Sequence, residues 1–183
     1  VVDSSMDVAQ ITDFIIEGAK TLNIKKWDFG ASFSADFSVQ IDKGIAKQLK
    51  ASQKQVLTLR VWNNKDLVGI TTTSDLSESG LKKALFQANL ASEYGNQNEK
   101  TDFSPLAKDP IKSLITKTNK PAGIKKLLEV LRIAETNLLN KHEAIKSIPY
   151  NGLSETFFKR FYANSDGASR SYQNSQAALY LYA

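Results

Sequence analysis

A single histidine, His142, is the residue best suited to metal binding or proton transfer, because the sequence contains no cysteine. It opens the segment KHEAIKS, which begins like the zinc motif His-Glu-x-x-His. The second histidine of that motif would fall at Lys146, and the longer form His-Glu-x-x-x-His would place it at Ser147. Zinc needs about three protein ligands that converge on one point. The sequence therefore predicts that His142 is a surface residue at a helix end.

Other candidate groups for catalysis also lack partners. Ser77 lies in the polar stretch TTTSDLSESG, but no base for a serine nucleophile is in view. Leu76 and Leu81 have the spacing of a hydrophobic staple around a helix start, so Ser77 is predicted to be an N-cap. The carboxylates Glu78 and Glu93 have no supporting pattern, and the glycines form no phosphate-binding loop. We therefore assign no catalytic, cofactor-binding or metal site to these residues.

The clearest structural pattern is an alternation of apolar and polar residues from position 27 to position 41. The apolar members are Trp27, Phe29, Ala31, Phe33, Ala35, Phe37, Val39 and Ile41. The polar members include Asp28, Ser34 and Asp36. Period two over this length predicts one long strand with a buried face and a solvated face.

Further strands are predicted on both sides of the middle of the chain. Residues 45–51, 55–62 and 67–73 complete a meander of about four antiparallel strands that begins at residue 27. Near the C-terminus, Asn151-Gly152 is a turn signal, and strands are expected near 155–163 and 168–182. The segment Asn164-Ser165-Asp166-Gly167 joins these last two strands.

Helices are predicted at residues 4–22, 78–94 and 122–140, each from an apolar stripe at helical spacing. Gly95 is expected to cap the second helix, and Pro121 lies near the first position of the third. Residues 95–121 form one long connector. The resulting fold class is α+β, with a largely antiparallel sheet of long strands packed against about three helices. A helix followed by strands occurs twice, which leaves open two similar α/β halves.

The net charge of +5 is concentrated in residues 108–146, which hold nine Lys/Arg against four Asp/Glu. A basic stretch of this kind is one signature of nucleic-acid binding. These lysines lack the arginines and interleaved aromatic residues of most nucleic-acid readers, so a solvated face is the favoured interpretation. No apolar run approaches the ~20 residues needed to span a bilayer, and no signal peptide is visible. We expect a cytoplasmic protein with no membrane partner.

Several segments together resemble the N-terminal region of the PmbA/TldD family. They are LTLRVWNNKDLVGITTTSDLS with ESGLKKALFQANLAS, then DFSPLA at 102–107, and FYANSDGASRSYQNSQAALYLYA, which is similar to the family's Asn-Ser-x-Gly hairpin. The likeness covers nearly the whole chain, residues 1–183. The phrase TTTSDLS looks more like the metal-free PmbA (TldE) branch.

The resemblance carries expectations that the residues alone do not give. The family has the older name "modulator of DNA gyrase", and its members form a two-subunit, bacterial-type zinc metallopeptidase that processes or degrades unfolded peptides. The resemblance implies that residues 1–183 are the N-terminal domain of one subunit, structural or chamber-forming rather than catalytic. The C-terminal half, which carries a His-Glu-x-x-x-His zinc site in one of the two subunits, is then expected to be absent from this chain. The implied partners are a sister subunit, in a homo- or heterodimer, and an unfolded peptide.

Two further expectations accompany this interpretation. The alternative function is a nucleic-acid-associated regulator that acts through the basic 108–146 stretch. The segment SQAALYLYA presents Leu179, Tyr180, Leu181 and Tyr182 in a strand that is expected either to pair with 155–163 inside the domain or to mediate self-association.

Overall fold

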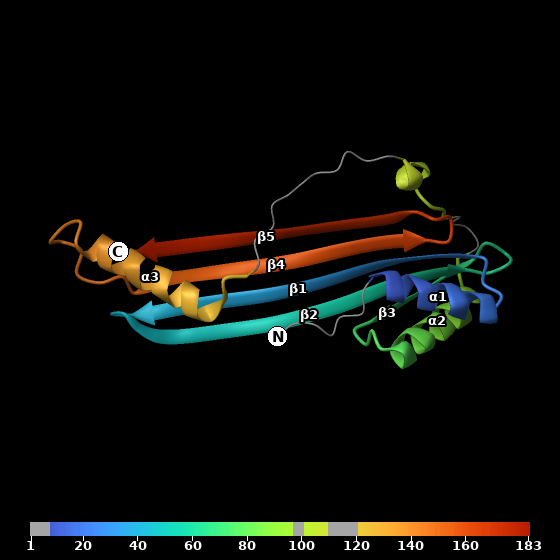
Figure 1. Cartoon of the computed structure of the whole chain (residues 1–183), viewed down its shortest axis with the longest axis horizontal. Coiled ribbons are helices and arrows are strands. Elements are labelled where there is room, and N and C mark those ends of the chain that lie inside the picture. Colours follow the sequence, from blue (N-terminus) through green and yellow to red (C-terminus); the bar gives the residue numbers. More distant parts are fainter. Residues whose placement is uncertain (1–7, 97–100, 110–120) are drawn as a thin grey trace. The chain divides into compact units, whose positions relative to one another are not determined.

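The computed structural model describes residues 8–96, 101–109 and 121–183 (Figure 1). These residues divide into two compact units. Unit 1 takes the described residues of Val1–Phe33, Gln55–Leu114 and Arg160–Tyr172. Unit 2 takes those of Ser34–Lys54, Ile115–Lys159 and Gln173–Ala183. No helix in the described ranges is long and apolar enough to cross a membrane.

One helix precedes three consecutive strands, and three helical segments then precede the last two strands. They are α1 (Val8–Thr21), β1 (Lys26–Asp42), β2 (Ile45–Trp62), β3 (Val68–Thr73), α2 (Glu78–Ser92), the 3-10 helix η1 (Pro105–Lys108), α3 (Gly123–Leu139), β4 (Tyr150–Asn164) and β5 (Ser169–Tyr182). The strands form one sheet in the order β3-β2-β1-β4-β5, and neighbouring strands run in opposite directions (Figure 1). The predicted α+β class, with a largely antiparallel sheet and three α-helices, is confirmed.

In unit 1, helices α1 and α2 pack on alternate residues of β1 and β2. The buried strand residues are Trp27, Phe29, Ala31, Leu57, Leu59 and Val61, and the buried helix residues are Ile11, Ile15, Ala19, Leu81, Leu85 and Ala88. Because strand side chains alternate between the two faces of a sheet, this set confirms the predicted period-two pattern. Burial of the larger aliphatic and aromatic side chains in this set contributes ~1.5–3 kcal/mol each.

In unit 2, a smaller core lies between α3 and the strands. Its buried members are Val39, Ile41, Leu127, Leu131 and Leu153. Phe37 packs against this core but is only partly buried, and Phe33 is also only partly buried. These two aromatic residues were predicted on the buried face, and the structure gives them an intermediate environment.

The start of α2 follows the sequence prediction and its end does not. Ser77 is the N-cap, and its hydroxyl accepts a 3.2 Å hydrogen bond from the backbone N–H three residues on. Leu76 and Leu81 both join the core of unit 1, as a hydrophobic staple requires. The predicted cap at Gly95 is wrong, because the helix ends at Ser92 with Glu93 as C-cap in a right-handed conformation. A Cβ on Gly95 would lie 2.9 Å from a Leu67 side chain, so glycine is needed there for close packing.

Two strand predictions are also wrong. Residues 45–62 form one continuous strand rather than two, since no Gly, Pro, Asn or Asp interrupts residues 51–55. Asn151-Gly152 is no turn but lies inside β4. The Asn151 amide accepts from Ile41 N at 3.0 Å and donates to Ile41 O at 2.8 Å, while a Cβ on Gly152 would lie 2.6 Å from the Tyr180 ring.

The structure gives the location of three further predicted features, and two others lie outside the described residues. The predicted turn at 164–167 is confirmed between β4 and β5. Pro121 lies near the start of α3 as predicted, directly before the N-cap Ala122. The start of the first predicted helix (4–7) and much of the 95–121 connector lie outside the described residues. Strand β5 pairs with β4 and is an edge strand of the sheet, with Leu179 and Tyr182 exposed.

Gly69 in β3 tests the close packing of β3 on α2. A Cβ at this position would lie 1.9 Å from the carbonyl oxygen of Ala88 and 2.4 Å from the backbone nitrogen of Ser92. We expect Gly69→Ala to lower the free energy of unfolding by ~1–3 kcal/mol, because the helix backbone must move away. Gly30→Ala is the matched control, since its Cβ would meet its nearest neighbour at 3.9 Å. Equal midpoints for the two variants in urea unfolding would contradict this packing.

Candidate binding site beside Trp27

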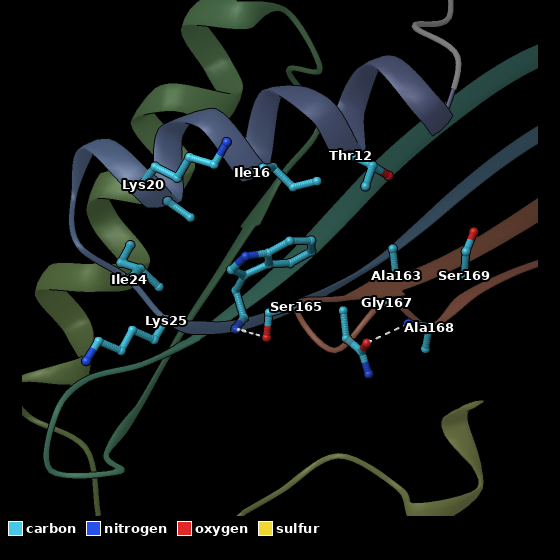
Figure 2. A pocket seen from close by; sticks show the side chains of 13 residues that line it. Thr12, Ile16, Lys20, Ile24, Lys25, Ala163, Ser165, Gly167, Ala168 and Ser169 are labelled. Atoms are coloured by element: carbon cyan, nitrogen blue, oxygen red, sulfur yellow. Dashed lines mark hydrogen bonds between the residues drawn. The ribbon is translucent and has the colours of Figure 1, made fainter. Parts of the chain in front are cut away.

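A cavity of about 360 Å³ lies in unit 1 between α1 and the β4–β5 hairpin (Figure 2). Its lining residues are Thr12, Ile16, Ala19, Lys20, Ile24, Lys25, Trp27, Ala163, Asn164, Ser165, Gly167, Ala168 and Ser169. Helix α1 supplies one wall, the start of β1 supplies Trp27, and the hairpin supplies the other wall. Its volume is near the lower end of the range for small-ligand pockets, ~300–1,000 Å³.

The hairpin wall is held by one buried amide, that of Asn164. Its Oδ1 accepts from the backbone nitrogens of Asp166 at 3.1 Å and Ala168 at 2.9 Å. Asn164 is 4% exposed and Ala168 is also buried, so loss of the bond to Ala168 would leave a buried N–H without a partner. Gly167 has φ +87°, a left-handed conformation that side chains rarely adopt. The Asn-Ser-x-Gly segment is therefore a turn in which the asparagine accepts backbone hydrogen bonds and the glycine permits a positive φ.

Ser165 joins the hairpin to the first residues of β1. Its backbone nitrogen donates to Trp27 O at 2.9 Å, and its hydroxyl accepts from Trp27 N at 3.2 Å (Figure 2). The first bond joins the two backbones directly, and in the second the hydroxyl acts as a structural acceptor for the Trp27 backbone. This geometry sets the position of the Trp27 backbone at the edge of the cavity.

The cavity has a basic and apolar lining without a carboxylate. Lys20 and Lys25 line it together with aliphatic residues of α1 and the segment that follows. Lys20 also forms an exposed ion pair with Glu17 at 2.8 Å, a contact of little energetic weight. The chemistry available here is binding of an apolar or anionic group, with no arranged nucleophile and base.

A second polar cluster lies on the face of β1 opposite to Trp27. Asp28 is 2% exposed and accepts both a bidentate contact from Arg60 and a 3.1 Å hydrogen bond from the Tyr162 hydroxyl. The Asn164 amide in turn donates to the Tyr162 oxygen at 3.4 Å. The network thus connects β2, β1 and β4 and reaches the asparagine that holds the hairpin.

The network shifts two pKa values. The hydrogen bond to Asp28 is the main cause that raises the pKa of Arg60, so the guanidinium stays charged. Burial raises the pKa of Tyr162 above its ordinary value of 10.0, and Asp28 adds to the shift. Tyr162 therefore remains a neutral hydrogen-bond donor at physiological pH. A buried carboxylate with a bidentate arginine and a phenol donor is fully satisfied, which favours a structural over a catalytic role.

The alternation had placed Asp28 on a solvated face, and this prediction is wrong in one respect. Asp28 does point away from Trp27 and Phe29, but Arg60 and Tyr162 cover it. A weak signal existed in the sequence, since Arg60 is the one charged residue in the apolar strand LTLRVW. Its partner could not be assigned without knowing which strands are neighbours.

A third cluster ties the DFSPLA segment to unit 1. Trp62 donates from Nε1 to the Thr101 carbonyl at 3.0 Å, and its ring meets Phe103 edge-on. The Lys26 ammonium lies 5.1 Å from the Trp62 ring centre and 2.8 Å from an Asp102 carboxylate oxygen. The hydrogen bond from Lys26 lowers the pKa of Asp102, with a further contribution from the Phe103 backbone N–H.

The residues first considered for catalysis are not brought together. His142 is exposed beyond the end of α3, where its Nδ1 accepts from Ala144 N at 3.1 Å, and this confirms its prediction as a surface residue. Glu78 and Glu93 flank the 15-residue helix α2, which separates them by roughly 20 Å at 1.5 Å per residue. Within residues 8–96, 101–109 and 121–183, no three His, Cys, Asp or Glu side chains gather in a way that could hold a metal ion.

Comparison with known proteins identifies solved structures that have a similar fold. No protein-family model and no curated protein matches the sequence. Among solved structures, a proposed modulator of a DNA gyrase from Thermotoga maritima matches with TM-score 0.75 and 16% identity, over 96% of this chain and 39% of its own. TldE from Thermococcus kodakarensis matches with TM-score 0.75 and 18% identity, over 93% and 38%. A proposed modulator of DNA gyrase from Bacteroides thetaiotaomicron matches with TM-score 0.74 and 14% identity, over 96% and 40%.

These likenesses define the class of fold. The chain has the fold of about two fifths of each of these structures, so the resemblance predicted from sequence is confirmed for the architecture. At identities of 14–18% the likeness concerns the fold.

Asn164→Ala tests whether the buried amide holds the cavity wall. The variant leaves two backbone donors without their acceptor, so we expect a loss of ~1–3 kcal/mol in the free energy of unfolding. In a Trp62→Phe background, Trp27 is the sole tryptophan, and its emission should shift to the red as the hairpin loosens. Asn64→Ala, at an exposed turn position, is the control. Unchanged stability and emission would contradict this role.

Proposed function

We propose that this chain is the N-terminal, non-catalytic domain of a subunit of a TldD/TldE-like zinc metallopeptidase complex that processes or degrades unfolded peptides. The observation that carries the proposal is the extent of the fold match. Three structures, one of them named TldE, match 93–96% of this chain, while the chain spans 38–40% of theirs. The sequence segments that resemble the PmbA/TldD family are the independent support.

A zinc centre does not fit the described part of this chain. His142 is exposed and its Nδ1 already accepts a backbone hydrogen bond, and there is no cysteine. Since zinc needs about three converging protein ligands, we assign no step of peptide cleavage to these residues. Within the proposed complex, the chain would shape the chamber and contact a sister subunit, and we propose the metal-free PmbA (TldE) branch for its parent. We also propose that this complex is cytoplasmic.

The coding sequence downstream of Ala183 gives the first test. The proposal expects the reading frame to continue into a further domain. A His-Glu-x-x-x-His motif there would make the parent the catalytic subunit, and its absence would support the metal-free branch. A stop codon directly after Ala183 would contradict the domain assignment. So would zinc-dependent cleavage of a reduced, unfolded peptide by the purified chain.

The second candidate function, DNA-associated regulation, is favoured by the names of two matched structures. In the structure, three cations of the 108–146 stretch have polar partners within the chain. Lys108 pairs with Asp166 at 3.5 Å, Lys126 pairs with Glu129 at 3.0 Å, and Arg132 donates to Gly44 O at 2.7 Å. Lys112, Lys117 and Lys120 lie outside the described residues. Tight DNA binding with a steep loss of affinity on adding salt would favour this function.

A further inference from the structure

Within the described residues, one length of strand β2 has a neighbouring strand on one side only, and the proposed function leaves this feature of unit 2 unexplained. Strand β3 pairs with β2 only over Leu57–Trp62, in the register Leu57↔Thr73 to Trp62↔Val68. Since β2 follows β3 at one side of the sheet, residues 45–54 of β2 have no strand beside them on that side within the part of the chain that the structure describes. We call residues 45–54 the free edge of β2.

The free edge is long and exposed on both faces. All ten of its side chains are exposed, and they include two large aliphatic residues, Ile45 at 72% and Leu49 at 51%. Natural edge strands are usually short, bulged or covered, because an open edge presents a row of unpaired N–H and C=O groups. A row of this kind is the template that an extended peptide uses when it adds to a sheet as a new strand.

The charge of the free edge indicates which kind of strand could pair with it. Its sequence, IAKQLKASQK, has Lys47, Lys50 and Lys54 and no Asp or Glu. Lysines on an edge discourage pairing with an identical edge, because like charges directly opposite each other destabilise a strand pair. The same three cations attract a strand of opposite charge. A second copy of this edge is therefore a poor partner, and an acidic extended segment is a good one.

A neighbouring cavity gives one lysine a second role. Lys47 lines a hollow of about 280 Å³ in unit 2, together with Gln40, Ile41, Pro149, Tyr150, Asn151 and Tyr180. The Tyr180 hydroxyl already accepts from the Gln40 amide at 3.1 Å, so the hollow is polar on that side. A carboxylate on an added strand would meet the Lys47 ammonium at the mouth of a polar hollow.

We propose that the free edge of β2 binds an acidic peptide segment in extended conformation, which adds to the sheet as a further strand. Backbone hydrogen bonds supply affinity without sequence selection, and Lys47, Lys50 and Lys54 supply the preference for Glu and Asp. Nucleic acid is the less suitable partner, because phosphates accept hydrogen bonds but cannot satisfy the carbonyl groups of the edge. The proposal concerns binding alone and stands whether or not the chain belongs to a peptidase subunit.

Fluorescence anisotropy of the whole chain with defined peptides tests the proposal. The probe is a fluorescein-labelled peptide of about ten residues that repeats Glu-Glu-Val-Val, so that a strand presents carboxylates on both faces, as Lys47 and Lys50 require. We expect saturable binding of this peptide and at least about tenfold weaker binding of the matched lysine–valine peptide. Two further probes carry N-methyl groups on alternate backbone amides, in the two complementary patterns. At least one pattern should lose binding, because it removes the donors that face the protein.

Charge reversal on the protein provides the matched control. The variant Lys47→Glu/Lys50→Glu/Lys54→Glu should reverse the preference and bind the lysine–valine peptide. The control Lys65→Glu/Lys82→Glu/Lys83→Glu makes the same change in net charge at exposed positions of unit 1 and should keep the original preference. Circular dichroism establishes that both variants are folded.

Each other outcome overturns the proposal. Absence of binding rules out the site. Binding that neither N-methyl pattern weakens indicates general electrostatic attraction without strand addition. Equal effects of the two triple variants indicate that net charge, rather than the free edge, is responsible. Tighter binding of a single-stranded oligonucleotide, lost in the Lys47/Lys50/Lys54 variant, assigns the edge to nucleic acid instead.

Discussion

The buried ion pair of Asp28 and Arg60 is the interaction on which the arrangement of unit 1 depends. A carboxylate that is almost fully removed from water is tolerated only when its oxygens are saturated, and here Arg60 and Tyr162 saturate them. The three residues come from β1, β2 and β4, so the network forms only when these strands are neighbours in the correct register. A pair of this kind need not add much net stability, but an incorrect register would leave a buried charge without a partner.

One residue, Asn164, connects this network to the candidate site. Asn164 donates to Tyr162 on one side and accepts from the hairpin backbone on the other. Ser165 then joins the hairpin to the backbone of Trp27. The cavity wall is thus fixed to the sheet by polar contacts, while the opposite wall is a helix held by apolar packing. Such an arrangement fits a preformed binding surface better than a catalytic centre.

The sequence predicted what periodicity and local capping determine. Alternation from Trp27 to Ile41 gave the long strand, and Ser77 with its leucine staple gave the start of α2. It failed where a residue's role depends on a distant neighbour. Asn151 looked like a turn residue until β1 was found beside it, and Asp28 looked solvated until Arg60 and Tyr162 were placed. Residues 45–51 were predicted as a strand, but the sequence did not show that β3 leaves them without a neighbour on one side, because the register of strand pairing cannot be read from composition.

A double-mutant cycle on Asp28 and Arg60, followed by urea unfolding, tests the central claim most directly. Arg60→Leu leaves a buried carboxylate without its partner and should lower the free energy of unfolding by ~3–5 kcal/mol. Asp28→Asn leaves a partly exposed guanidinium without its partner and should lower it by less. The double variant contains neither charge, so no buried charge is left without a partner. We therefore expect it to be more stable than the sum of the single losses by about 1 kcal/mol or more. Additivity within ~0.5 kcal/mol would show that the two side chains do not act together, and would contradict the account.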